Sequence, residues 1–116
     1  DGTMHVFTLD PQVEQMISDN VRTFDTGSQL VLDPETTRQI LTGARDQIER
    51  MAALGYTPVA LCSPRTRMHF RRLAERMSPT LAVLSFNEIA QGAGLDTVGM
   101  VSFSNENAED YSRLSA

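Results

Sequence analysis

The single cysteine of the chain lies directly before its densest group of arginines, a pairing that could support phosphate chemistry. Such chemistry needs a thiolate at the bottom of a backbone cradle and an arginine that clasps the phosphate. The segment CSPRTR that begins at Cys62 contains no glycine, and Pro64 removes one backbone N–H donor. The sixth residue after Cys62, where phosphatase loops carry arginine, is Met68. We therefore interpret Cys62 as a small buried residue at the end of a core strand, and keep a small phosphotransferase or thiol hydrolase as the alternative.

The arginines that follow form a second group of candidate functional residues. Five of the ten arginines lie between residues 65 and 76, and the chain has no lysine. At about 100° per residue, a helix centred on Phe70 places no arginine on its apolar face. Three interpretations are open: a solvated face, a surface that contacts another protein, and a nucleic-acid contact. Guanidinium groups pair bidentately and stack, which favours protein or phosphate contacts, whereas the net charge of −5 disfavours nucleic acid.

Other chemical signatures are weak. His5 and His69 lie 64 residues apart, and neither has a cysteine or carboxylate at ligand spacing. The sequence also lacks the glycine-rich nucleotide-binding loops and the nucleophile elbow of serine hydrolases. We therefore predict no metal, no cofactor and no catalytic residue.

Proline pairs predict where the helices that position these residues begin, because aspartate or serine caps the first turn and proline fits its first position. Asp10-Pro11, Asp33-Pro34 and Ser63-Pro64 are such pairs. Apolar runs bounded by turn signals predict buried strands. The expected helices cover about residues 11–24, 34–54 and 64–78. The later expected strands cover residues 57–62, 81–85 and 95–103, and the last of these is expected to be an edge or closing strand. A short helical turn is expected at residues 86–90.

The expected element order is β-α-(β)-α-β-α-β-β, which predicts an α/β fold with a small mixed β-sheet packed against three main helices. At 116 residues, the length is that of one domain. We expect a single domain over residues 1–103 and an acidic, disordered tail over 104–116. The residues expected to share one core are Phe7, Leu9, Ile17, Ile40, Ile48, Val59, Leu61, Phe70, Leu73, Leu81 and Val83.

The segment from Gly55 to Ile89 resembles the C-terminal cytoplasmic domain of the FHIPEP family, the large export-gate subunits of flagellar and virulence type III secretion systems. The similarity rests on SP-x-x-R at Ser63–Arg67, the helix with Arg72 and Arg76, and VLSFNEI at Val83–Ile89. VGMVS at Val98–Ser102 and the two upstream Leu-Asp-Pro segments extend it to about residues 5–103. The Asn-Glu-Ile form looks more like flagellar than injectisome members.

The resemblance implies that this chain is the last cytoplasmic subdomain of a longer membrane-embedded parent at the cytoplasmic face of the bacterial inner membrane. It further implies no enzymatic activity and a role in protein export, within a ring of identical subunits. The implied partners are the other ring subunits, the stalk of the export ATPase and chaperone–substrate complexes; a stand-alone regulatory module is the other alternative. The candidate partner-binding residues are Arg65, Arg67, Arg71, Arg72, Arg76, Asn87 and Glu88.

Overall fold

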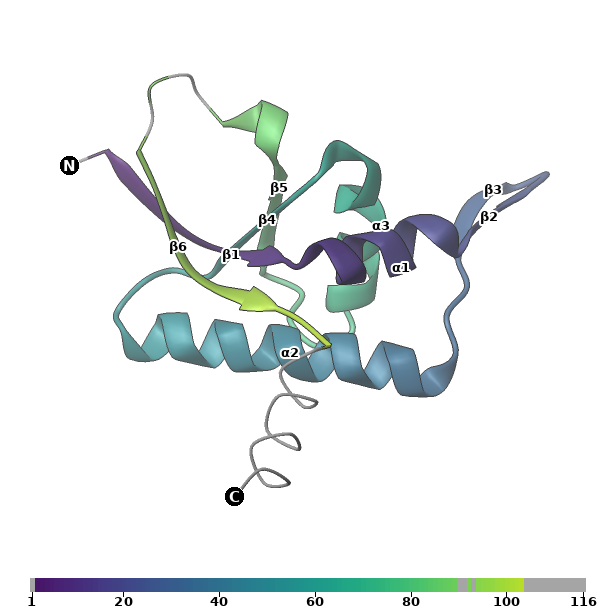
Figure 1. Ribbon diagram of the computed structural model, residues 1–116, viewed down its shortest axis with the longest axis horizontal. Helices are drawn as coiled ribbons and strands as arrows, with labels where there is room; N and C mark the ends of the chain where they lie inside the picture. The colour runs from purple at the N-terminus through teal and green to yellow at the C-terminus, as the bar shows by residue number, and fades with distance from the viewer. Residues whose placement is uncertain (1, 90–91, 93, 104–116) are drawn as a thin grey trace, which may run out of the picture.

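Four parallel strands form the main sheet of the chain (Figure 1). The structure is a computed structural model that describes residues 2–89, 92 and 94–103, so the tail predicted over residues 104–116 lies outside the described residues. The strands are arranged in the order β5-β4-β1-β6, which leaves β5 and β6 at the two edges. Their bounds are β1 Thr3–Leu9, β4 Val59–Cys62, β5 Ala82–Ser85 and β6 Gly94–Val101.

Three α-helices begin at the three predicted prolines. They are α1 Pro11–Asp19, α2 Pro34–Ala53 and α3 Pro64–Ala74, and a short 3-10 helix, η1 Phe86–Glu88, follows β5. The Asp10 carboxylate accepts a bond from the Gln12 N–H (2.6 Å), and Asp33 accepts one from the Thr36 N–H (3.1 Å), so both aspartates cap as expected. In the described part of the chain, no helix is both long and apolar enough to cross a membrane. The predicted α/β fold with three main helices is confirmed.

The first predicted helix is too long, because α1 ends at Asp19 and not near Phe24. The chain then forms an antiparallel hairpin, β2 Val21–Phe24 and β3 Gly27–Leu30, which projects from the body in Figure 1. Val21, Thr23 and Phe24 are β-branched or aromatic and favour a strand, and Gly27 provides the positive φ (124°) beside the turn. The helical spacing of Val21 and Phe24 was therefore misleading, and Phe24 remains 49% exposed.

One apolar core joins the three helices to a single face of the sheet. Of the predicted core residues, Phe7, Leu9, Ile17, Ile40, Phe70, Leu73, Leu81 and Val83 belong to it, and Ile48 packs against it half-buried. Leu61 is buried but lies outside this cluster. Because side chains alternate along a strand, Leu61 faces the opposite side of the sheet from Ala60. Val59 is half-buried and also lies outside the cluster.

Candidate docking surface

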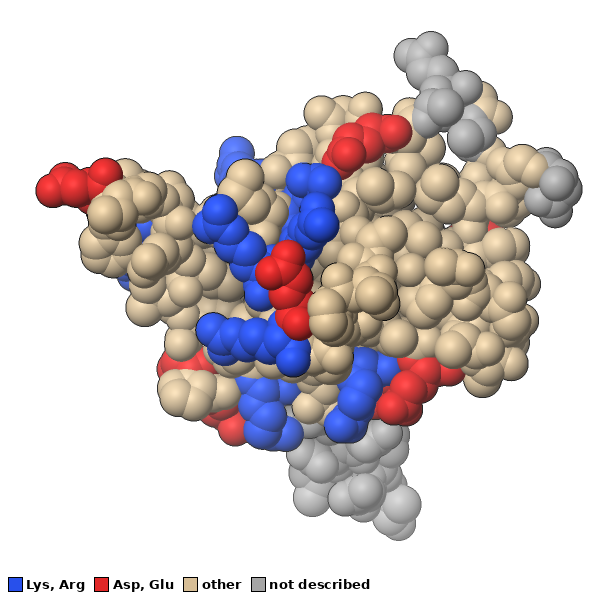
Figure 2. Space-filling model, turned by 180° about the vertical axis from the view of Figure 1, so that it is seen from behind, with Lys and Arg blue, Asp and Glu red and all other residues tan. Residues whose placement is uncertain are grey.

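Helix α3 displays its arginines on the outside of the molecule. Its inner side is buried, with Thr66, Phe70, Leu73 and Ala74 between 0% and 7% exposed, and Met77 packs half-buried beyond its end. This arrangement confirms the predicted apolar stripe, and no arginine of α3 is buried. Figure 2 shows basic side chains gathered on the face seen from behind, with acidic side chains between and beside them. A group of arginines is therefore exposed on a chain whose net charge is −5.

Three of the candidate partner-binding residues are engaged within the molecule. The Nε of Arg67 donates to the Val83 carbonyl (3.1 Å) and forms an ion pair with Glu88 (2.8 Å). Glu88 also accepts bonds from the N–H (3.0 Å) and the hydroxyl (2.9 Å) of Ser85, and the Ser85 hydroxyl bonds to the side-chain oxygen of Asn87. This network fastens η1 and β5 to α3, so Arg67, Asn87 and Glu88 have a structural role whether or not they also contact a partner.

The network makes a pH-dependent contribution to stability. The pKa of Glu88 is lowered, chiefly because its carboxylate accepts the backbone N–H of Ser85, and also through the Ser85 hydroxyl and the charge of Arg67. A carboxyl group whose pKa is lower in the folded than in the unfolded state stabilises the fold above its ordinary pKa. This stabilisation is lost as the pH falls through the lowered value, when the carboxylate is protonated.

The remaining arginines of the group are available to other molecules. Arg71 pairs with Glu75 one helical turn away (3.6 Å), a solvent-exposed pair that contributes little to stability. Arg65, Arg72 and Arg76 are exposed, and in the part of the chain that the structure describes no acidic side chain lies within ion-pair distance of them. We refer to Arg65, Arg72 and Arg76 as the arginine face.

Glu14 positions the arginine helix, and the sequence alone did not identify it. Its side chain, on α1, accepts bonds from the Ser63 N–H (3.1 Å) and the Thr66 hydroxyl (2.7 Å). Ser63 does not cap α3 with its own side chain, which differs from the prediction. The Glu14 carboxylate instead lies at the N-terminus of α3, where the helix dipole favours a negative charge. Because Glu14 precedes Ser63 by 49 residues, no local spacing connects the two.

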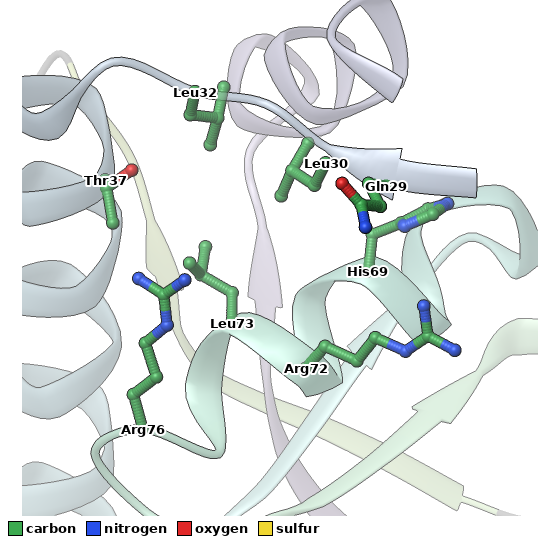
Figure 3. A pocket seen from close by; sticks show the side chains of 8 residues that line it. All are labelled: Gln29, Leu30, Leu32, Thr37, His69, Arg72, Leu73 and Arg76. Carbon is green, nitrogen blue, oxygen red and sulfur yellow. The ribbon is translucent and has the colours of Figure 1, made fainter. Parts of the chain in front are cut away.

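Two hollows adjoin Arg72 and Arg76. The first, of about 390 Å³, lies between β3, the start of α2 and α3, and is lined by Gln29, Leu30, Leu32, Thr37, His69, Arg72, Leu73 and Arg76. Figure 3 shows Leu30, Leu32 and Leu73 pointing toward one another, with Arg76 extending toward Thr37. The second, of about 580 Å³, continues along α2 and is lined by Leu32, Pro34, Thr37, Arg38, Leu41, Thr42, Arg45, Arg76 and Met77. The Nδ1 of His69 is buried, and no hydrogen-bond partner for it is found among the described residues.

The two histidines lie in unrelated surroundings. His5 pairs with Asp96 (2.9 Å) and stacks on Tyr56 with ring centroids 3.8 Å apart, whereas His69 lines the first hollow. Across residues 2–89, 92 and 94–103, no group of three His, Cys, Asp or Glu side chains is placed to hold a metal ion.

Cys62 sits in an environment that suppresses thiol chemistry. The residue is 0% exposed, and its sulfur lies 3.8 Å from the Leu84 carbonyl oxygen. Burial raises the pKa of the thiol to about 11, against a smaller opposing contribution from the Thr66 hydroxyl. A nucleophilic cysteine needs a lowered pKa and access to its substrate, and Cys62 has neither.

Thiol titration should reflect this burial. We expect Cys62 to react with a disulfide reagent at pH 8 far more slowly in the native chain than in denaturant, because both the thiolate fraction and the access are low. We also expect Cys62→Ala to leave partner binding unchanged. Rapid labelling of the native chain near neutral pH, or a phosphatase activity that Cys62→Ala removes, would contradict the docking account.

Comparison with known proteins identifies a matching family model, that of the FHIPEP family, over residues 1–94. The chain is 38% identical over 101 residues to the flagellar biosynthesis protein FlhA of Caulobacter vibrioides, covering 87% of this chain and 14% of that protein. It is 33% identical over 98 residues to FlhA of Bacillus subtilis, covering 84% of this chain and 14% of that protein.

A solved structure of a complex between the Chlamydia pneumoniae proteins CdsV and CdsO contains a similar fold. The TM-score is 0.77 at 32% sequence identity, and the match covers 88% of this chain and 30% of the solved chain. The present chain therefore spans about one seventh of the length of the curated relatives that it matches.

Proposed function

Because this chain belongs to the FHIPEP family, we propose that it is a non-enzymatic subdomain of a type III protein export gate and that it docks export partners through the arginine face. The observation that carries this proposal is the set of three exposed arginines that have no acidic partner in the described part of the chain. Folding does not use these charges, so they can contact other molecules.

The proposed partners are acidic surfaces of the export apparatus. Neighbouring subunits of a homo-oligomeric ring are the first, because a subunit with a cationic face and a net charge of −5 can meet the acidic side of its copy. The stalk of the export ATPase and chaperone–substrate complexes are the others, and the complex of CdsV with CdsO supports a docking role in general. Nucleic acid is not a proposed partner, because the chain as a whole repels it.

We place this function in flagellar assembly, supported by the two similar proteins that are named for flagellar biosynthesis. The parent protein would be embedded in the bacterial inner membrane, with residues 1–103 as one of its cytoplasmic subdomains. A thiol enzyme centred on Cys62 is not favoured, because burial raises the pKa of this thiol to about 11.

Reversal of the arginine face tests the proposal. In the full-length parent, the triple variant Arg65→Glu, Arg72→Glu and Arg76→Glu should accumulate normally but reduce protein export and motility severalfold. The expected loss is collective, because each exposed ion pair gives only about 0.2–1 kcal/mol. Single reversals should therefore be mild, and thermal melting of the isolated chain should show that the triple variant still folds.

The matched control is Arg22→Glu with Arg50→Glu, which reverses two arginines outside α3. This variant should support nearly normal export. If the triple variant exports like the parent at low salt, or if the control is impaired equally, the arginine face is a solvated surface and the proposal fails.

A further inference from the structure

The two hollows beside α3 adjoin one another. They share Leu32, Thr37 and Arg76, so together they extend from the base of the hairpin along the N-terminal half of α2. We call the two hollows together the α2–α3 groove. The lining residues of α2 run from Pro34 to Arg45, a distance of about 17 Å at 1.5 Å per residue. This length corresponds to about three turns of a docked helix.

The floor of the groove is apolar, and its free positive charge lies on the α3 side. Leu30, Leu32, Leu41 and Met77 pack half-buried against the core, and Leu73 is 7% exposed. On the α2 side, Arg38 pairs with Glu35 (2.6 Å) and Arg45 lies 4.0 Å from Glu49. On the α3 side, Arg72 and Arg76 have no acidic partner among the described residues. Such a surface has the charge and shape for a partner that is apolar in the middle and acidic along one side.

We propose that the α2–α3 groove binds an acidic amphipathic helix of a partner protein. The apolar stripe of such a helix, at i, i+3, i+4 and i+7, would cover the leucine floor. Carboxylates on one flank of the helix would reach Arg72 and Arg76. The identity of the partner rests on the proposed docking function. The apolar and acidic character of the docked helix follows from the groove alone.

A helix fits this groove better than an extended segment. An extended peptide gains affinity by pairing its backbone with a free strand edge, and the long walls of the groove are the helices α2 and α3, whose backbone groups are largely bonded within the helix. A helix satisfies its own backbone and needs side-chain contacts only.

A second copy of the chain is a poorer occupant. The described helices α1, α2 and α3 already bury their apolar stripes in their own core, through residues such as Val13, Ile40 and Phe70. None of them has an unused stripe to place in the groove of a neighbour. The occupant is therefore expected to come from a different protein.

Binding of designed peptides tests the proposal on the purified 116-residue chain. The probe is a fluorescein-labelled helix of about 18 residues, with leucine in an amphipathic stripe and glutamate on one flank. The comparison peptides are a scrambled sequence of the same composition and a version with lysine in place of glutamate. In anisotropy titrations, the acidic amphipathic peptide should bind at least about tenfold more tightly than either comparison peptide.

Variants of the chain locate the binding. Arg72→Glu with Arg76→Glu should weaken binding of the acidic peptide at least about tenfold. Leu41→Gln should weaken it about fivefold, because it places a polar side chain in the apolar floor of the groove. Arg22→Glu with Arg50→Glu changes the net charge equally and should leave binding within about twofold. Each variant is first shown to melt like the parent.

Three results would overturn the proposal: equal binding of the scrambled peptide, an equal loss in the Arg22/Arg50 control, and self-association of the parent chain that Leu41→Gln abolishes. The last would make a second copy the occupant. The peptide titration and the export assay can fail independently. If the acidic peptide does not bind but the triple variant loses export, the arginine face docks partners by charge alone. If the peptide binds but the triple variant exports normally, the proposed function fails.

Discussion

Replacing Phe70 with alanine is expected to lower the free energy of unfolding by about 3–5 kcal/mol. The side chain is 0% exposed and lies in the core cluster with residues of all three helices and the sheet. Removing its ring deletes the transfer free energy of the aromatic group and leaves a cavity that fixed neighbours can close only in part. Since small domains are stable by about 5–15 kcal/mol, this change alone could remove most of the stability.

Denaturant titration followed by circular dichroism measures the effect, and Phe70→Leu is the matched control. Leucine retains much of the apolar volume, so its cost should be clearly smaller. Equal stability of Phe70→Ala and the parent would mean that α3 does not pack on the sheet as described. The arginine face would then lose the scaffold that orients it.

The second large effect concerns the two faces of the sheet. Leu61→Ala and Val83→Ala should each lower the free energy of unfolding by about 2–4 kcal/mol, because the side chains are 1% and 3% exposed. Val83 belongs to the core shared with the helices, and Leu61 is buried on the opposite face. The two substitutions therefore test the packing of opposite faces of the same pair of strands.

Val59→Ala is the control for this pair, because Val59 lies on β4 with Leu61 but is only half-buried. Its cost should be well below that of Leu61→Ala. A negligible loss for Leu61→Ala would contradict the burial of the second face of the sheet.

Local chemistry made much of the fold predictable. Asp10, Asp33 and Ser63 each precede a proline, and all three helices begin there. The apolar stripe of α3 was predictable because Phe70 and its neighbours recur at helical spacing and are indeed buried. The short strands β4 and β5 also followed from apolar runs between turn signals. In each case, the signal lies within a few residues of the feature that it specifies.

Features that depend on distant contacts were not predictable. Val21 and Phe24 continue the helical spacing of α1, and only the antiparallel pairing with Gly27–Leu30 makes them a strand. Glu14 meets Ser63 only in the folded chain. The pairing of Arg67 with Glu88 likewise depends on how η1 folds back toward α3. The α2–α3 groove joins residues from the hairpin, α2 and α3, so no single motif indicates it.

The central claim, that the arginine face docks an export partner, is tested most directly by calorimetric titration of the chain with the purified stalk protein of the export ATPase. The parent chain and the Arg65→Glu, Arg72→Glu, Arg76→Glu variant are compared at about 50 and 300 mM salt, between which the screening length falls about 2.4-fold. We expect the parent chain to bind the stalk protein with an affinity that falls as salt rises, and we expect the variant to bind at least about tenfold more weakly at low salt. Equal affinity of the two chains at low salt would contradict the central claim.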